Sequence, residues 1–151
     1  MNLIAIKGSI KLAVHITKAF AFVSNLDNDR VWRKEINVTK MSGEPAFGVL
    51  AEESTYFSKR NSNQLLQLEC TDFVENKLAV YTTISSSPFY LKSVRNLTEI
   101  SNHETLFEYE VSFDPAIVKA GIGISLPRFI IQWGAQRDMK NYLKQLSKVL
   151  R

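Results

Sequence analysis

The chain offers few residues whose types and spacing could carry out chemistry. Its histidines are His15 and His103 and its one cysteine is Cys70, all far apart in the sequence. A metal site cannot be assembled from these residues at such separations. No glycine-rich phosphate loop, serine nucleophile elbow or HExxH motif occurs either. The sequence therefore predicts no metal, no cofactor and no catalytic residue from a known motif.

A pair of adjacent carboxylates could still serve inside a binding site. Glu52 and Glu53 fall within a predicted strand, where successive side chains point to opposite faces of the sheet. A carboxyl group that faces the interior has a raised pKa and could act as a general base. We favour the simpler alternative, in which this carboxylate lies near a strand end and reaches solvent.

The direction of Arg95 depends on strand register. If the turn after its strand centres on His103, Arg95 shares a face with Tyr109 and could clamp a ligand carboxylate through two hydrogen bonds. If the hairpin is one residue tighter, every side chain flips and Val94 points inward instead. We favour a solvent-facing Arg95, because buried arginines without partners are rare.

A sheet must position these side chains. Apolar segments, alternating or continuous and bounded by turn residues, predict about seven strands. The predicted strands are Leu3–Val14, Glu35–Met41, Ala46–Phe57, Gln64–Phe73, Leu78–Ile84, Phe89–Ile100 and Thr105–Phe113. Gly8 in the first strand indicates a bulge or a sharp bend. After this strand, Lys18–Leu26 and a turn that reaches Trp32 predict two short helices.

The segment Ser125–Arg151 predicts one long helix. Pro127 suits its first turn, and no proline follows. Its apolar residues form two sets on faces about 130° apart, counted at roughly 100° per residue. The change falls at Gly134, so either the helix bends there or its two halves pack against different partners.

The connections between these elements define the fold class. Strands joined by short turns must be antiparallel, and the resulting sheet has one face to cover. The C-terminal helix is the only cover available. We therefore predict an α+β, helix-grip arrangement in a single domain over residues 1–151. In it, a curved antiparallel sheet of about seven strands wraps around one long C-terminal helix, with two short helices after strand 1.

Composition excludes several classes of protein. The apolar content of 45% and charged content of 23% are ordinary for a soluble globular chain. The segment Met1–Leu12 is too short and too often interrupted to be a signal peptide or a membrane span. A single cysteine excludes an internal disulfide and permits a reducing compartment. We therefore expect a cytoplasmic protein without an integral membrane segment.

A net charge of +4 permits an acidic partner. The outer face of the long helix carries a basic stripe that consists of Arg137, Lys140, Lys144, Lys148 and Arg151. We expect this stripe to be solvated, with peripheral contact to an acidic membrane as the alternative. No nucleic acid partner is expected, because no aromatic residues interleave the stripe. The sequence does not determine the oligomeric state.

The order of elements resembles the helix-grip fold of the START-like, or SRPBCC, superfamily, which includes polyketide cyclase/dehydrase-like proteins. Three stretches carry the resemblance: Phe20–Trp32 (FAFVSNLDNDRVW), Asn96–Phe113 (NLTEISNHETLFEYEVSF) and the C-terminal helix with Trp133 and YLKQLSKVL. Where family members often have glycines in the hairpin turn, this chain has Asn102-His103-Glu104. The resemblance implies a cavity for an apolar or amphipathic small molecule.

We expect the cavity wall to come from the inward faces of the strands and from the long helix. The candidate ligand-binding residues are Phe47, Val49, Leu66, Leu68, Val80, Phe107 and Tyr109 in strands, Phe129, Ile130 and Trp133 in the helix, and Arg95 as a polar anchor. The alternative is that the apolar residues simply fill a solid core.

Three functions remain open at this point. The leading hypothesis is a protein that binds or carries a lipid-, quinone- or polyketide-like molecule, which a large and wholly apolar cavity would favour. The second is a cyclase/dehydrase-type enzyme, which an inward carboxylate or arginine beside Tyr109 would favour. The third is a protein-interaction domain with a collapsed cavity, which a filled interior and an exposed apolar patch would favour.

Overall fold

The computed structural model describes residues 2–151. Its elements, in chain order, are β1 (Ile4–Leu12), α1 (Ile16–Val23), the 3-10 helix η1 (Leu26–Val31), β2 (Ile36–Met41), β3 (Leu50–Thr55), β4 (Gln64–Val74), β5 (Leu78–Thr83), β6 (Leu91–Ser101), β7 (Glu104–Phe113), α2 (Ala116–Ile122) and α3 (Arg128–Val149). The predicted strands, the short helices after strand 1 and the long C-terminal helix are confirmed.

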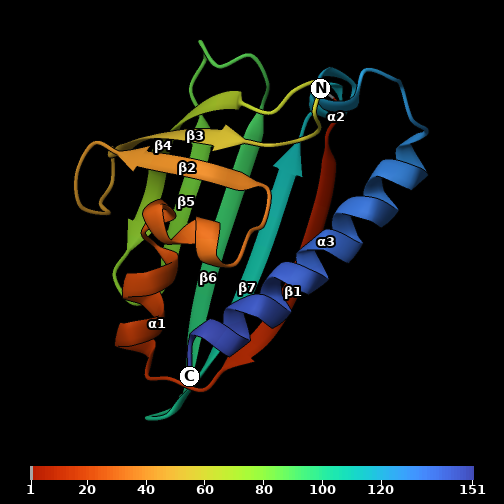
Figure 1. The fold of residues 1–151 in the computed structure, drawn as a ribbon. Helices are drawn as coiled ribbons and strands as arrows, with labels where there is room; N and C mark the ends of the chain where they lie inside the picture. Colours follow the sequence, from red (N-terminus) through yellow and green to blue (C-terminus); the bar gives the residue numbers. More distant parts are fainter. Residues whose placement is uncertain (1) are drawn as a thin grey trace.

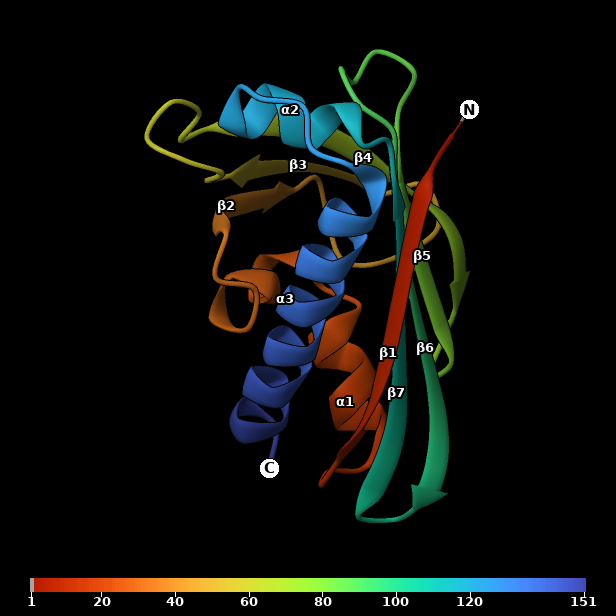
Figure 2. The same ribbon diagram turned by 90° about the vertical axis from the view of Figure 1, so that its right-hand side faces the viewer.

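The strands form one seven-stranded antiparallel sheet in the order β1-β7-β6-β5-β4-β3-β2. Register shifts interrupt three of its strand pairs, namely β2 with β3, β4 with β5 and β6 with β7, and such bulges bend a strand. The sheet curls so that β2 and β3 extend over the side on which α1 and α3 lie (Figure 1, Figure 2). This concave side holds the hydrophobic core.

Aromatic contacts fix the short helices to the concave face. Trp32, directly after η1, packs edge-on against Phe107 and Tyr109 of β7, with ring centroids 6.2 and 5.3 Å apart. The hydroxyl of Tyr81 in β5 donates a hydrogen bond of 2.7 Å to the carbonyl oxygen of Ser24. The segment between β1 and β2 is therefore part of the core and is not a surface loop.

Gly8 has a different role from the predicted bulge. β1 pairs with β7 in unbroken register from Ile4 to Leu12, so no residue is inserted there. A Cβ at position 8 would lie 2.8 Å from Cδ1 of Leu143 in α3. Gly8 therefore allows α3 to approach β1 closely, which is the other common use of glycine in a strand.

The two halves of α3 pack against different surroundings, and the helix continues through Gly134 without interruption. Its second half buries Met139, Leu143 and Leu146 against the sheet, whereas in the first half only Ile131 is buried. The change of packing partner, one of the two alternatives from the sequence, is present in the structure. Within residues 2–151 no helix, α3 included, is both long and apolar enough to cross a bilayer.

Candidate functional site

A pocket of about 530 Å³ lies between the concave face of the sheet and α3. Its volume falls in the range of known small-molecule sites. Most of the wall is apolar and comes from strands, from α2 and from the first half of α3. The apolar lining includes Ile6, Leu66, Val111, Phe113, Ile117 and Ile131.

One end of the pocket is polar. The polar side chains that gather there include Arg33, Glu35, Glu53, Tyr109 and Tyr142. The other polar residues that line the pocket are Lys34, Thr55, Tyr56, Arg137 and Asp138. Arg33 and Glu53 are buried, with 9% and 3% of their surface exposed. The solvent-facing alternative that we favoured for the strand carboxylate is therefore wrong, because Glu53 points into the pocket. Buried charges need partners, and these two residues supply them to each other.

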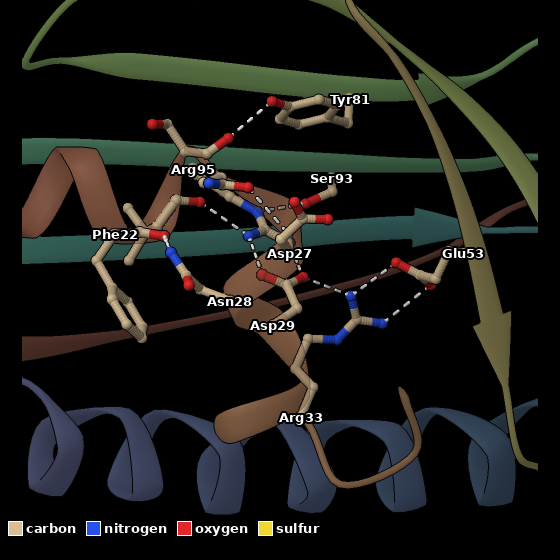
Figure 3. Close-up of polar contacts among 12 residues, drawn as sticks. Phe22, Asp27, Asn28, Asp29, Arg33, Glu53, Tyr81, Ser93 and Arg95 are labelled. Atoms are coloured by element: carbon tan, nitrogen blue, oxygen red, sulfur yellow. Dashed lines mark hydrogen bonds and ion pairs between the residues drawn. The ribbon is translucent and has the colours of Figure 1, made fainter. Parts of the chain in front are cut away.

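Arg33 is the centre of this polar end (Figure 3). Its Nη1 donates hydrogen bonds to Asp29 Oδ2 at 2.9 Å and to Glu53 Oε2 at 3.2 Å. Its Nη2 lies 3.0 Å from Glu35 Oε1, and its Nε donates to the same oxygen at 3.1 Å. Burial by itself would lower the pKa of Arg33, but Glu53 and the other negative charges hold this pKa well above its ordinary value.

Behind Arg33, the carboxylate of Asp29 binds a second guanidinium group. Nη1 and Nη2 of Arg95 each lie 2.6 Å from one carboxylate oxygen of Asp29, in the paired geometry that carboxylates and arginine favour. Nη1 also donates to the carbonyl oxygen of Val23 at 2.9 Å, and Nε donates to Ser93 Oγ at 3.1 Å. Asp29 and Arg95 are both completely buried.

Arg95 therefore faces inward, and the solvent-facing direction that we favoured is wrong. The strand register is the one with the turn at His103, because Arg95 pairs with Tyr109. Its guanidinium carbon lies 5.3 Å from the ring centroid of Tyr109 and 5.5 Å from that of Trp32. The carboxylate that Arg95 clamps is Asp29 of its own chain, and Arg95 does not line the pocket. Arg33, and not Arg95, is the buried arginine that lines the pocket.

The charged groups of this cluster do not balance. With every group ionised, Arg33 and Arg95 face Asp29, Glu35 and Glu53, which leaves a net charge of −1. Burial raises the pKa of Glu53 against the opposing effect of Arg33, and the negative charges of Asp29 and Glu35 raise it further. A proton on Glu53 makes the cluster neutral. Glu53 is therefore the group in the pocket best placed to take up and release a proton.

Glu35 leaves a free acceptor at the same end. Its Oε1 binds Arg33, whereas its Oε2 is buried and has no hydrogen-bond partner within residues 2–151. Burial, the charge of Glu35 and a hydrogen bond to Glu35 raise the pKa of Tyr142. Burial also raises the pKa of Tyr109, although both arginines oppose it. The pocket thus presents to an occupant two neutral phenols and the oxygen of the Glu35 carboxylate that Arg33 does not bind. Its carboxylates are held by arginines, and the described residues contain no group of three or more His, Cys, Asp or Glu side chains placed so that they could hold a metal ion.

Apart from Arg95, the predicted ligand-binding residues divide into three groups. Those that line the pocket are Leu66, Tyr109, Ile130 and Trp133. Those that are buried in the core without lining the pocket are Val49, Leu68 and Phe107. These three side chains fill the solid core, as in the alternative given in the sequence analysis.

The third group lies away from the pocket. Val80 alternates along β5 with the inward Tyr81, so it points to the convex face of the sheet. Phe47 is 73% exposed, because β3 begins only at Leu50 and leaves Phe47 in a loop. Phe129 is 72% exposed, because the second half of α3 packs on the sheet and leaves the side of the helix that carries Phe129 facing solvent.

Sequence reasoning missed Asp29, Arg33, Glu35 and Tyr142 as parts of the site. One signal was present, since Asp29 and Arg33 are four residues apart beside a tryptophan. Charge pairs at this spacing usually lie on a solvated helix surface. Here the partners Glu53 and Arg95 come from strands 20 and 66 residues away along the chain, and no local pattern announces them.

The sequence matches no known family model and no curated protein. A START superfamily protein from Mycobacterium smegmatis nevertheless superposes with a TM-score of 0.75 at 10% identity, over 97% of this chain and 96% of the other. The Zhui aromatase/cyclase from Streptomyces sp. R1128 gives 0.75 at 9% identity, over 99% and 94%. A conserved protein from Geobacillus kaustophilus gives 0.72 at 14% identity, over 97% and 95%. At these identities the likeness concerns the fold.

We expect Asp29→Asn to lower the free energy of unfolding by roughly 3–5 kcal/mol, because it leaves Arg95 buried without a carboxylate. Asp27→Asn is the matched control, since Asp27 lies in the same 3-10 helix but is exposed, and its effect should stay within about 0.5 kcal/mol. Urea unfolding of both variants measures the difference. Equal effects would show that the buried pair does not stabilise the fold.

We expect Glu53→Gln to change how stability depends on pH. Because the pKa of Glu53 is raised in the folded state, the folded protein keeps this proton at pH values where the unfolded chain has lost it. Wild-type stability therefore falls relative to the variant as pH rises from 4.5 to the folded-state pKa, by up to about 1.4 kcal/mol per pH unit. Urea unfolding between roughly pH 4 and pH 8 tests this. Parallel stability curves would contradict a raised pKa.

Proposed function

We propose that this protein, whose helix-grip fold is that of the START superfamily, binds a small, largely apolar molecule with a neutral hydrogen-bonding group at one end. The observation that carries the proposal is the 530 Å³ pocket, which combines an apolar wall with a polar end at Arg33 and Glu53. Ligand pockets commonly orient their occupant through a few polar groups in an apolar wall. Lipid-, quinone- and polyketide-like molecules have this chemistry.

The charges at the polar end favour a neutral ligand group over a carboxylate. The cluster around Arg33 is net negative when ionised, and every pocket-facing nitrogen of Arg33 already binds a carboxylate oxygen. Oε2 of Glu35, which no arginine binds, can accept a hydrogen bond from a hydroxyl or N–H group of a ligand, because a carboxylate oxygen has two lone pairs. Tyr109, as a neutral phenol, can donate one to a carbonyl. A hydroxylated or carbonyl-bearing apolar molecule satisfies both.

Cyclase/dehydrase-type catalysis is a second candidate function, and one observation favours it. Glu53 is an inward carboxyl group with a raised pKa beside Arg33 and Tyr109, which is the arrangement that the sequence analysis required of an enzyme. In this role Glu53 removes a proton from a carbon next to a ligand carbonyl, and Arg33 positions Glu53. One structure with the same fold is an aromatase/cyclase by its printed name. The open pocket, in contrast, gives no support to a domain with a collapsed cavity.

Filling the pocket should abolish binding. A Cβ at Gly134, which lines the pocket, would meet no atom within 4 Å, so Gly134→Leu places its side chain in the cavity without disturbing the core. We expect the variant to bind N-phenyl-1-naphthylamine, a neutral apolar fluorophore with one N–H donor, at least about tenfold more weakly than wild type. Gly134→Ala is the matched control and should bind like wild type. Equal affinities of all three proteins would place the fluorophore elsewhere.

Native mass spectrometry of freshly purified protein provides an independent measurement. A one-to-one adduct that is released on denaturation, and that is absent from Gly134→Leu, is the expected result. An apo mass together with no fluorophore binding would overturn the proposal of a ligand pocket.

For the second candidate we expect wild-type protein to accelerate exchange of the acidic C–H protons of benzoylacetone in D2O, and Glu53→Gln to lose the acceleration. The diketone carries a carbonyl for Tyr109 and an acidic carbon for Glu53. Proton NMR follows the exchange, and fluorophore binding by Glu53→Gln confirms that its pocket is intact. Exchange at the buffer rate with wild type would rule out this use of Glu53.

A further inference from the structure

One solvent-exposed side of α3 combines aromatic and basic residues. We call this the outward face; it consists of Phe129, Trp133, Arg137, Lys140, Lys144 and Lys148, and all six side chains are exposed. At roughly 100° per residue they fall within an arc of about 100°. The buried residues of α3 occupy the opposite side of the helix.

The charge of the outward face is of one sign. Between Arg128 and Arg151 the only acidic residue is Asp138, which lies on the pocket side of the helix. Lys140 and Lys144 also line a groove of about 650 Å³ between α3 and β1, together with Arg137 and Trp133. Four cations, none of which forms an ion pair within residues 2–151, thus gather along one side of one helix.

The apolar part of the outward face lies at the mouth of the pocket. Phe129 and Trp133 are 72% and 64% exposed, and Ile124, in the segment before the helix, is 59% exposed. Trp133 and its neighbour Ile130 line the pocket as well as meeting solvent. Exposure of several large apolar side chains at one place marks an interaction site more often than chance exposure does.

The aromatic residues correct the reasoning that we applied to the basic stripe. We had expected the first apolar set of the helix to face inward, leaving no aromatic residue on the basic side. In the structure the guanidinium carbon of Arg137 lies 4.9 Å from the ring centroid of Trp133, so aromatic and basic residues share one surface. A solvated charged face alone does not account for this arrangement.

We propose that the outward face of α3 docks on the surface of an anionic phospholipid bilayer. The cations would contact lipid phosphates, and Phe129 and Trp133 would enter the interface, where aromatic rings are preferred. Because Trp133 and Ile130 also line the pocket, docking places the pocket mouth against the bilayer. Nucleic acid fits less well, since the aromatic residues gather at one end of the face and do not alternate with the cations. The proposal goes beyond the proposed function and does not require a particular pocket ligand.

The test is co-sedimentation with vesicles of phosphatidylcholine, with and without phosphatidylglycerol. We expect binding only when phosphatidylglycerol is present, and weaker binding as salt rises. Lys140→Glu with Lys144→Glu should weaken binding at least about thirtyfold, because each basic residue contributes roughly fivefold to partitioning onto an anionic surface. The matched control is Lys18→Glu with Lys59→Glu, which makes the same change in net charge on exposed residues outside α3, and it should lose less than about fivefold.

Trp133 provides a direct signal of docking. Trp32 is buried and Trp133 is exposed, so acrylamide quenching of wild type reports mainly on Trp133. Vesicles should protect it, and Trp133→Phe should remove the protected signal. Equal loss of binding in both charge-reversal pairs, or binding to a single-stranded oligonucleotide in place of vesicles, would overturn the proposal. Binding of N-phenyl-1-naphthylamine by the two charge-reversal variants, whose lysines do not line the pocket, shows that fold and pocket are intact. Failure of docking is therefore distinguishable from failure of the pocket.

Discussion

Asp29 binds Arg95 and Arg33 at the same time, and the polar end of the pocket depends on this arrangement. Asp29 and Arg95 are fully buried, so that loss of either partner would leave an unpaired charge in the interior. Through these contacts η1 is fixed to β6, and Arg33 carries the connection on to Glu53 in β3. The position of η1 in turn sets where Arg33 enters the pocket.

The chemistry of the pocket follows from the charge count of the same cluster. One carboxylate more than the number of arginines lies in a buried site, and Glu53, at the edge that faces the pocket, has the raised pKa. Arg33 is saturated by its neighbours, so it orients carboxylates and is not free to bind one from a ligand. This is why the site suits a neutral hydrogen-bonding group better than an acid, and why proton transfer by Glu53 is chemically reasonable.

The long helix α3 forms part of the pocket wall and also the exposed surface at the pocket mouth. Its second half is held on the sheet by Met139, Leu143 and Leu146, with Gly8 allowing the close approach to β1. Its first half is held far less by the core, so the space beneath it stays open as the pocket. The side chains that this half cannot bury, Phe129 and Trp133, become the apolar end of the outward face. One helix thus relates the proposed ligand site to the proposed membrane contact.

The sequence by itself determined the strands, the antiparallel pairing of those joined by short turns, and the long helix, because alternation, turn residues and helical periodicity are local properties. Seven strands and one C-terminal helix leave few ways to cover an antiparallel sheet. Only the tertiary structure decided which side chains meet. The direction of Arg95 depended on a single residue of hairpin register, and its partner Asp29 lies 66 residues away. The direction of Phe129 depended on which half of α3 the curved sheet could bury. The direction of a side chain and its partner depend on long-range packing. A shift of one residue in strand register, or of one face in helix packing, leaves almost no trace in the local sequence pattern.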